Sequence, residues 1–350
     1  MRMLKFLLYP FSWLYGVVIA VRNFLFDKGL LPSKEFHTPV ISVGNLAVGG
    51  TGKTPHSEYL IRLLQASYRV ALLSRGYRRT TKGFILANAT ANAQTIGDEP
   101  YQIYRKFPQI NVAVAEKRVE GIERLLQLSP PPQVVLLDDA FQHRYVRVGL
   151  SVLLTDYANR WTTDNLLPYG RLREPRSGAK RADIVIVTKC PPTLSLHERE
   201  IIASELDLLP SQTLYFTTYR YGVPSPVFSS TAPFAVDSSQ TILMVTGVVS
   251  AVGLYDYLVA MFKNVRWLSF PDHHFFTSKD ILKIASEMAK SRATAVVVTE
   301  KDASRLLSMA DSLPENLKTR LYSIGVEVDF LDHGKEFDAQ ILSFVENRLS

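Results

Sequence analysis

Val40-Ile-Ser-Val-Gly-Asn-Leu-Ala-Val-Gly-Gly-Thr-Gly-Lys-Thr-Pro55 joins an apolar run of strand type to a glycine-rich turn and then to a helix-like segment. Glycines let backbone N–H groups converge on phosphate oxygens, and the helix N-terminus adds partial positive charge. The first glycine of the pattern G-x-x-x-x-G-K-[S/T] is replaced by Ala47, so a glycine-rich hairpin that binds nothing is the alternative. The order of strand, loop and helix favours nucleotide binding. The candidate ATP-binding residues are Gly49, Gly50, Thr51, Gly52, Lys53 and Thr54, in which Lys53 can reach the β/γ-phosphates and the Thr54 hydroxyl can bind Mg²⁺.

The composition describes a folded chain with a basic surplus. Its 350 residues suit two domains, with 47% hydrophobic and 21% charged residues. The net charge of +7 favours polyanionic partners, namely nucleic acid, acidic lipid or a phosphorylated substrate, without choosing among them. Cys190 is the single cysteine, which excludes an internal disulfide and a cysteine-cluster metal site. A reducing, cytoplasmic location follows.

The N-terminus is apolar and aromatic, and basic residues flank it. Residues 6–21 carry no charge, and the run is a few residues shorter than the about 20 that a membrane-spanning helix needs. Pro10 suits the first turn of a helix that ends near Phe26. A helix packed on the core is the alternative, but we favour residues 1–30 as an interfacial anchor on an anionic membrane surface.

Apolar runs alternate with helical patterns along the rest of the chain. Buried β-branched strands separated by helices predict an α/β fold with a doubly wound, mostly parallel sheet, like that of P-loop NTPases, over residues 31–221. Residues 222–240, rich in Pro, Ser and Thr, are predicted as a linker ribbon. The alternation then restarts, so residues 241–350 are predicted as a second, smaller α/β domain.

Polar clusters follow several of the predicted strands, where ligands of such sheets bind. Val134–Leu137 ends in Asp138-Asp139, which in a P-loop protein is the usual source of a Mg²⁺ ligand, although such a pair alone is commonly a helix cap or a turn. Gln142 and His143 come next. A structural role for that histidine and a functional one are both open.

Three further segments carry groups suited to phosphoryl transfer. Asp98 in Gly97-Asp-Glu-Pro100 is a candidate proton acceptor, although simple helix capping explains it equally well. Arg173 lies in a basic loop that could neutralise transferring phosphate. Asp272 and His273 end a strand of the second domain and are suited to proton transfer.

Together these motifs resemble the lipid A 4′-kinase family, the tetraacyldisaccharide 4′-kinases, over nearly the whole chain. Ala140 stands where the family usually has glycine. The matching motifs, in order, are Val43-Gly-Asn-Leu46 with Gly49-Gly-Thr-Gly-Lys-Thr-Pro55, Ser74-Arg-Gly-Tyr77, Gly97-Asp-Glu-Pro100, Asp138-Asp-Ala-Phe-Gln-His143, Leu172-Arg-Glu-Pro175, Asp272-His273 and Thr299-Glu-Lys-Asp302.

The resemblance implies an enzyme at the cytoplasmic face of the bacterial inner membrane that uses ATP and Mg²⁺. It would phosphorylate the 4′-hydroxyl of a tetraacylated glucosamine disaccharide 1-phosphate to give lipid IVA in lipid A biosynthesis, without nucleic acid or an obligate protein partner. The implied roles are phosphate and Mg²⁺ binding for Lys53 and Thr54, metal surroundings for Asp138, Asp139 and Glu174, deprotonation by Asp98 assisted by His273, charge stabilisation by Arg173, and site lining by Glu99, Gln142 and His143.

Rivals from other classes fit less well. A membrane-bound regulatory ATPase of the deviant-Walker type carries a lysine before Gly-Gly, where this chain has Val48. A GTPase needs Asn-Lys-x-Asp, and Thr188-Lys-Cys-Pro191 lacks the aspartate. Nucleic-acid binding lacks an aromatic stacking platform or a recognisable module.

Overall fold

The strand β1 (Val40–Asn45) lies inside a nine-stranded sheet in the computed structural model, which describes residues 7–248, 251–272 and 274–350. The strand order is β14-β8-β7-β6-β1-β5-β2-β4-β3. In this order, all adjacent strands from β8 to β4 pair parallel, whereas β3 and β14 pair antiparallel at the two edges. The other strands are β2 (Val70–Ser74), β3 (Ile85–Leu86), β4 (Asn111–Val114), β5 (Val134–Asp138), β6 (Leu150–Asp156), β7 (Ile184–Thr188), β8 (Thr213–Tyr221) and β14 (Val326–Phe330).

Helices cover both faces of this sheet, which explains why its central strands are buried and rich in Val, Ile and Leu. One face packs against α3 (Lys53–Gln65), α5 (Asp98–Lys106) and α12 (Gly334–Leu349). The opposite face packs against α6 (Arg118–Leu126) and α7 (Leu196–Leu206). The doubly wound, mostly parallel sheet predicted from the sequence is therefore confirmed.

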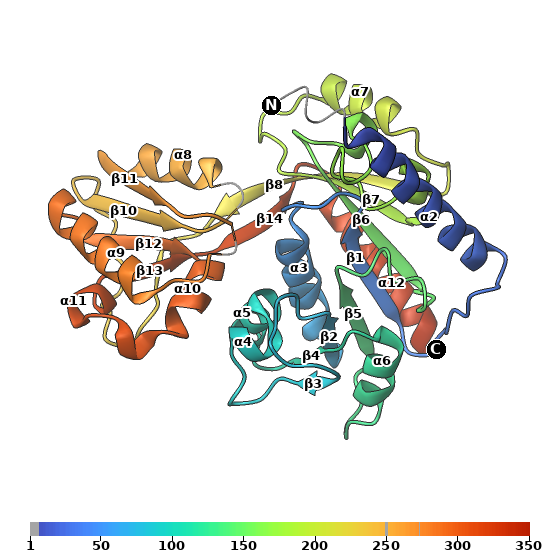
Figure 1. Cartoon of the computed structure of the whole chain (residues 1–350), viewed down its shortest axis with the longest axis horizontal. Coiled ribbons are helices and arrows are strands. Elements are labelled where there is room, and N and C mark those ends of the chain that lie inside the picture. The colour runs from blue at the N-terminus through green and yellow to red at the C-terminus, as the bar shows by residue number, and fades with distance from the viewer. Residues whose placement is uncertain (1–6, 249–250, 273) are drawn as a thin grey trace.

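A second sheet forms the smaller domain, in orange and red in Figure 1. Within the described residues its order is β11-β10-β12-β13-β9, parallel except for β9. Helices α9 and α10 pack on one face and α8 on the other. These elements are β9 (Ser225–Pro226), β10 (Thr241–Thr246), β11 (Asn264–Ser269), β12 (Ala295–Thr299), β13 (Leu321–Ile324), α8 (Val252–Met261), α9 (Ser278–Ser291), α10 (Glu300–Leu307) and α11 (Glu315–Lys318). Further short helices are α4 (Ala93–Ile96), η1 (Trp161–Thr163) and η2 (Arg176–Arg181) in the large domain and η3 (Ala310–Ser312) between α10 and α11.

The chain crosses between the domains twice, through β8 and β14. The first half of β8 pairs with β7, and its second half pairs antiparallel with β14, which gives the two-stranded ribbon in Figure 1. After β14 the chain returns to the large domain, where Phe337, Ile341 and Val345 of α12 enter the core. The predicted domain of residues 241–350 is therefore too long at its end. The predicted linker, residues 222–240, also contributes β9 to the small sheet. Composition could not reveal the return of α12 to the large domain or the place of β9 in the small sheet, because both depend on contacts between segments far apart in the sequence.

The N-terminal helix α2 (Tyr9–Asp27) lies along the large domain with one face inward (Figure 1). The buried Ser12 hydroxyl donates to the Leu166 carbonyl at 2.7 Å, and a side chain at Gly16 would collide with Leu166. The other face exposes large apolar side chains, namely Tyr9, Phe11, Trp13, Leu14, Val17, Val18, Val21 and Phe24. Among the helices of the described chain, none has the length and apolarity to cross a bilayer.

Candidate active site

The glycine-rich loop joins β1 to α3 as the sequence predicts. Gly52 precedes α3 with a φ of +90°, a conformation that favours glycine, and α3 begins at Lys53. The Tyr219 hydroxyl occupies the place that a β-carbon on Gly52 would take. The backbone amides of the loop therefore stand at a helix N-terminus, which is the arrangement that binds phosphate.

Side chains from neighbouring strands hold this loop in place. Asn45 donates to the Thr51 hydroxyl at 2.8 Å, and the Thr188 hydroxyl donates to the Thr51 carbonyl at 2.9 Å. Ala47, at the position of the missing glycine, pairs as an isolated bridge with Leu172. Because a second segment, not a tight turn, fixes the backbone there, the loop does not need glycine at that position.

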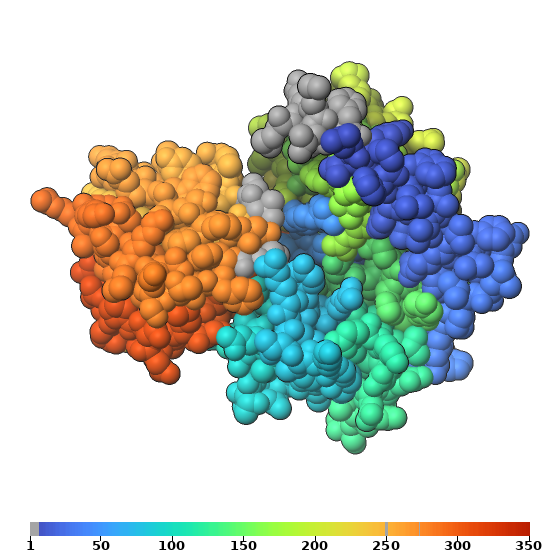
Figure 2. All heavy atoms as spheres, viewed as in Figure 1, coloured from blue at the N-terminus to red at the C-terminus, as the bar shows by residue number. Residues whose placement is uncertain are grey.

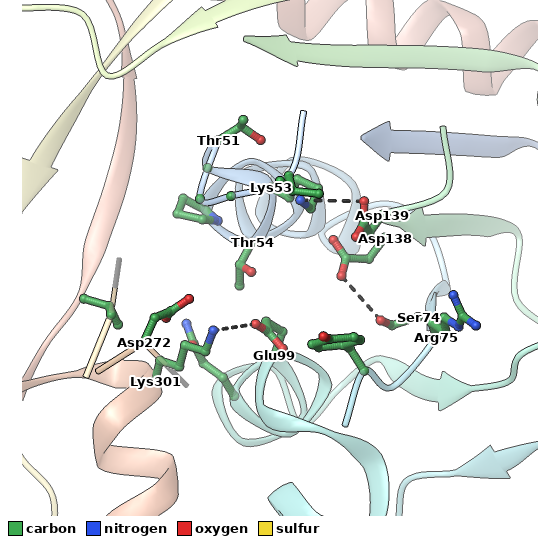
Figure 3. Close-up of a pocket in the computed structure, with 18 of the residues that line it drawn as sticks. Thr51, Lys53, Thr54, Ser74, Arg75, Glu99, Asp138, Asp139, Asp272 and Lys301 are labelled. Atoms are coloured by element: carbon green, nitrogen blue, oxygen red, sulfur yellow. Dashed lines mark hydrogen bonds and ion pairs between the residues drawn. The ribbon is translucent and has the colours of Figure 1, made fainter. Parts of the chain in front are cut away.

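A cavity of about 1150 Å³ opens over the loop, and its wall comes from both domains. Figure 2 shows the molecular surface hollowed between the orange small domain and the large domain. The predicted residues that line it are Gly49, Gly50, Thr51, Gly52, Lys53, Thr54, Glu99, Asp138, Asp139, Gln142, His143, Arg173, Glu174 and Asp272. In Figure 3 the side chains of Thr54, Asp138 and Glu99 point into a common space.

Asp138 ends β5 and is the more buried of the two aspartates. Its carboxylate accepts hydrogen bonds from Ser57 at 3.3 Å and from Ser74 at 3.4 Å. Burial, together with the neighbouring charge of Asp139, raises the pKa of Asp138 to about 6. A cation beside this carboxylate would favour its ionised form, so the site suits a positive ligand.

Asp139 instead lies in an ion-pair cluster. Arg173 donates to both of its oxygens, at 2.9 and 3.1 Å, and Lys53 Nζ lies 3.6 Å from Oδ1. Burial raises the pKa of Asp139, but Lys53 and Arg173 outweigh that effect, so the pKa lies below its ordinary value. The positive φ of +49° falls on Asp139. The methyl group of Ala140 therefore does not sit at the left-handed residue of the turn.

Glu174 and Gln142 form a hydrogen-bonded layer beside the loop. Gln142 Nε2 donates to the Asn45 carbonyl at 2.7 Å and to Glu174 Oε1 at 2.9 Å. Arg181 donates to Glu174 Oε2 at 2.7 Å, and Glu174 is 2% exposed. These partners engage both oxygens of Glu174, so the structure places it with Gln142 and Arg181. Its role as a metal ligand stays a prediction.

A group of basic side chains lines the cavity on the α6 side. Arg118 is 2% exposed, and burial lowers its pKa to about 10. Its Nη1 donates to the Ala115 carbonyl at 2.6 Å, whereas its buried Nε has no hydrogen-bond partner in the described structure. Burial, together with the charges of Arg118, Arg22 and Arg75, lowers the pKa of His143 to about 4. His143 is therefore neutral at neutral pH within a strongly positive wall.

The second domain supplies the remaining wall of the cavity. Lys301 pairs with Glu99 at 2.7 Å, and Asp272 lines the cavity near them (Figure 3). Asp98 starts α5, is 8% exposed, and pairs with Arg305 of α10 at 2.7 Å. Asp98 thus lies at the domain boundary beside Glu99. His273 lies outside the described residues, so its predicted role stays a prediction.

The donor set fits a hard divalent cation shared with phosphate. Mg²⁺ usually binds one or two carboxylates and keeps waters and phosphate oxygens as its other ligands. Thr54, Asp138 and Asp139 offer a hydroxyl and carboxylates on one cavity wall. Accordingly, the described chain contains no group of three or more His, Cys, Asp or Glu that could cage a metal ion by itself.

The contacts of two residues around this site were not predicted from the sequence. Lys189 pairs with Asp156 at 2.7 Å and donates to the Gly50 carbonyl, which ties β7 to the loop. Arg305 belongs to none of the motifs found in the sequence. Its i, i+3 spacing from Asp302 was a readable signal for their ion pair, but its contact with Asp98 spans more than two hundred residues.

Comparison with known proteins matches nearly the whole chain in both sequence and structure. Residues 4–346 match the family model described as LpxK, tetraacyldisaccharide-1-P 4′-kinase. A tetraacyldisaccharide 4′-kinase of Bacteroides fragilis is 49% identical over 348 residues, which cover 97% of this chain and 92% of that protein. One of Flavobacterium johnsoniae is 45% identical and is covered over 99% of its length. The crystal structure of Aquifex aeolicus LpxK in complex with ATP superposes with a TM-score of 0.74 at 29% identity, over 98% of this chain and 99% of that chain.

Proposed function

The chain belongs to the tetraacyldisaccharide-1-P 4′-kinase family, and on that premise we propose how its cavity transfers phosphate. It is an ATP-dependent kinase of lipid A biosynthesis that phosphorylates the 4′-hydroxyl of a tetraacylated glucosamine disaccharide 1-phosphate to give lipid IVA. One observation supports the assignment of roles. Lys53 and the rest of the loop from Gly49 to Thr54 line the same cavity as carboxylates from both domains.

The loop would hold the phosphates of ATP through its amides and the Lys53 ammonium. Lys53 and Arg173 flank Asp139, so two positive charges lie where negative charge develops on the transferring group. Thr54 and the aspartates would hold Mg²⁺, which would supply positive charge beside the phosphates of ATP.

In the transfer step the sugar 4′-oxygen bonds to the γ-phosphorus as the bond from that phosphorus to the β–γ bridging oxygen breaks. The hydroxyl proton passes to the Asp98 carboxylate, and ADP leaves with the electron pair of the broken bond. Glu99 lines the cavity at the position next to Asp98, so the acceptor sugar would approach along the start of α5.

The basic wall suits the anionic end of the acceptor. Arg75, Arg118 and Arg22 line the same cavity as the glycine-rich loop, and Arg118 has a buried Nε that no described group accepts from. Guanidinium groups bind phosphate with paired N–H donors. We assign the 1-phosphate of the disaccharide to this wall, which would turn the 4′-hydroxyl toward the loop.

The apolar face of α2 would insert into the anionic cytoplasmic surface of the inner membrane. Large side chains such as Trp13 and Val18 are mostly exposed, while the opposite face packs on the cavity wall. An acyl-bearing acceptor could then stay in the bilayer while its sugar reaches the cavity. Binding to vesicles with and without acidic lipid tests this assignment.

Transfer itself is tested with radiolabelled ATP and the tetraacyl disaccharide 1-phosphate. We expect label in a bis-phosphorylated lipid, and we expect Lys53→Met to abolish that product. Release of the label only as inorganic phosphate, independent of lipid, would instead favour a regulatory ATPase.

A further inference from the structure

Arg305 is a buried cation at the boundary between the two domains. Its side chain is 3% exposed, and it lies on α10 of the small domain, the helix that places Glu300 and Lys301 in the cavity wall. A guanidinium is rarely buried unless charged or polar partners surround it. The identity of those partners indicates what Arg305 does.

Among the described residues of the large domain, the guanidinium contacts the carboxylate of Asp98. Nε and Nη2 both donate to Oδ2 of Asp98, at 3.0 and 2.7 Å. Because the guanidinium is planar and rigid, two N–H bonds from it fix the position of Oδ2 far better than one bond from a flexible ammonium group would.

The remaining donor ties Arg305 to its own domain. Nη1 donates to the Gly247 carbonyl at 2.9 Å and to Asp302 Oδ1 at 3.0 Å. Asp302 is itself held, because Oδ2 accepts from the Gly247 amide at 3.0 Å and from the Thr299 hydroxyl at 2.7 Å. Arg305 therefore projects from a fixed frame in the small domain onto Asp98.

Other charged pairs also join α10 to α5. Lys301 pairs with Glu99, and Lys106 pairs with Glu300 at 2.6 Å. These pairs can hold the domains together. The pair with Arg305 differs because its acceptor is the carboxylate assigned to take the proton.

We propose that Arg305 is a positioning residue for the kinase reaction, which orients the Asp98 carboxylate from the opposite domain for contact with the acceptor hydroxyl. The proposal rests on the role given to Asp98 above. It also makes alignment of the proton acceptor depend on the arrangement of the two domains, since half of the pair belongs to each.

A double-mutant cycle tests this with the full-length enzyme. We expect Asp98→Asn to lower kcat about 100-fold or more. We expect Arg305→Ala to lower kcat about 100-fold in the parent with little change in KM for ATP, because a misplaced catalytic group costs about this much. In the Asp98→Asn background the same change should cost less than about threefold, since residues that act as a unit are not additive.

Arg305→Lys keeps the charge and provides a second variant should Arg305→Ala fail to fold. It should retain only about a tenth of the parent kcat, because it loses the paired N–H geometry. Added guanidinium ion should restore part of the kcat of Arg305→Ala. Arg199, another largely buried arginine, pairs with Asp332 at 2.5 Å away from the cavity. Arg199→Ala should therefore lower the melting temperature without changing kcat.

The outcomes separate the two claims. An equal loss from Arg305→Ala in both backgrounds, or an unaltered kcat in Arg305→Lys, overturns the positioning role. An Asp98→Asn enzyme with the parent kcat instead overturns the role of Asp98, and the proposal for Arg305 falls with it.

Discussion

Tyr15 of α2 donates a 2.6 Å hydrogen bond from its hydroxyl to the backbone carbonyl of Arg173, the arginine that pairs with Asp139. Asn23, two turns further along the helix, lies 3.4 Å from Glu174. The face of α2 turned away from solvent therefore supports the loop that carries Arg173. The helix assigned to the membrane surface is thus also part of the wall of the active site.

Tyr15→Phe should lower kcat even when the lipid acceptor is dispersed in detergent. Loss of one hydrogen bond corresponds to about 1 kcal/mol, or roughly a fivefold change in rate if the loop shifts. The measurement is kcat in mixed micelles, where membrane binding does not limit the reaction.

Val18→Ser is the matched control, because Val18 lies on the exposed face of the same helix at 58% exposure. It should weaken binding to acidic vesicles and leave kcat in micelles unchanged. If Tyr15→Phe altered only the vesicle binding, α2 would be an anchor without a part in positioning Arg173.

Gly52→Ala should destabilise the fold, whereas Gly50→Ala should not. Gly52 has a φ of +90° and faces the Tyr219 hydroxyl, while a β-carbon on Gly50 would meet no atom within 4 Å. Such strain costs about 1–3 kcal/mol. Urea unfolding of the two variants measures the difference, and equal free energies of unfolding would contradict the assigned loop geometry.

His56 should make the enzyme less stable in mild acid. Burial lowers its pKa to about 4 from the ordinary 6.5, although Nδ1 lies 2.8 Å from the Gly52 carbonyl. Above pH 6.5 the ring is neutral in both states. As the pH falls from 6.5 toward 4 the unfolded chain binds the proton first, so the free energy of unfolding falls by up to roughly 3 kcal/mol.

His56→Gln should remove this slope between pH 6.5 and 4, as measured by urea unfolding at several pH values. His197→Gln is the control, since the His197 side chain is 82% exposed. A slope that persisted in His56→Gln would assign the acid sensitivity to other groups.

Arg75→Ala should weaken binding of the phosphorylated acceptor through the basic wall. Loss of a charge-assisted hydrogen bond is worth about 1.5–3 kcal/mol, so KM for the disaccharide 1-phosphate should rise roughly tenfold or more. In the Arg75→Ala variant, KM for a tetraacyl disaccharide without the 1-phosphate should be close to KM for the phosphorylated acceptor. An equal rise in KM for both acceptors would place the phosphate elsewhere.

The sequence predicted local features of this molecule well and long-range pairing less well. The loop from Gly49 to Thr54 and the aspartates after β5 follow from strand, turn and helix patterns over short segments, and the structure brings them together. Three features could not be predicted in that way. The return of α12 to the large domain, the bridge from Ala47 to Leu172, and the pair of Asp98 with Arg305 each join segments that no local pattern relates.

Glu174 provides the sharpest contrast between the resemblance and the geometry. The resemblance implies metal surroundings for it, whereas Gln142 and Arg181 engage its two oxygens in the structure. Asp138, with a pKa raised by burial to about 6, is the carboxylate whose ionised form a cation would stabilise most.

We therefore expect Asp138→Asn to raise the Mg²⁺ concentration for half-maximal activity at least about tenfold. Glu174→Gln should lower kcat with little change in that concentration, because it frees Arg181 and loosens Gln142. Chelation by EDTA should abolish turnover in the parent, and excess Mg²⁺ should restore it. A Mg²⁺ requirement that rose in Glu174→Gln as much as in Asp138→Asn would return Glu174 to the metal site.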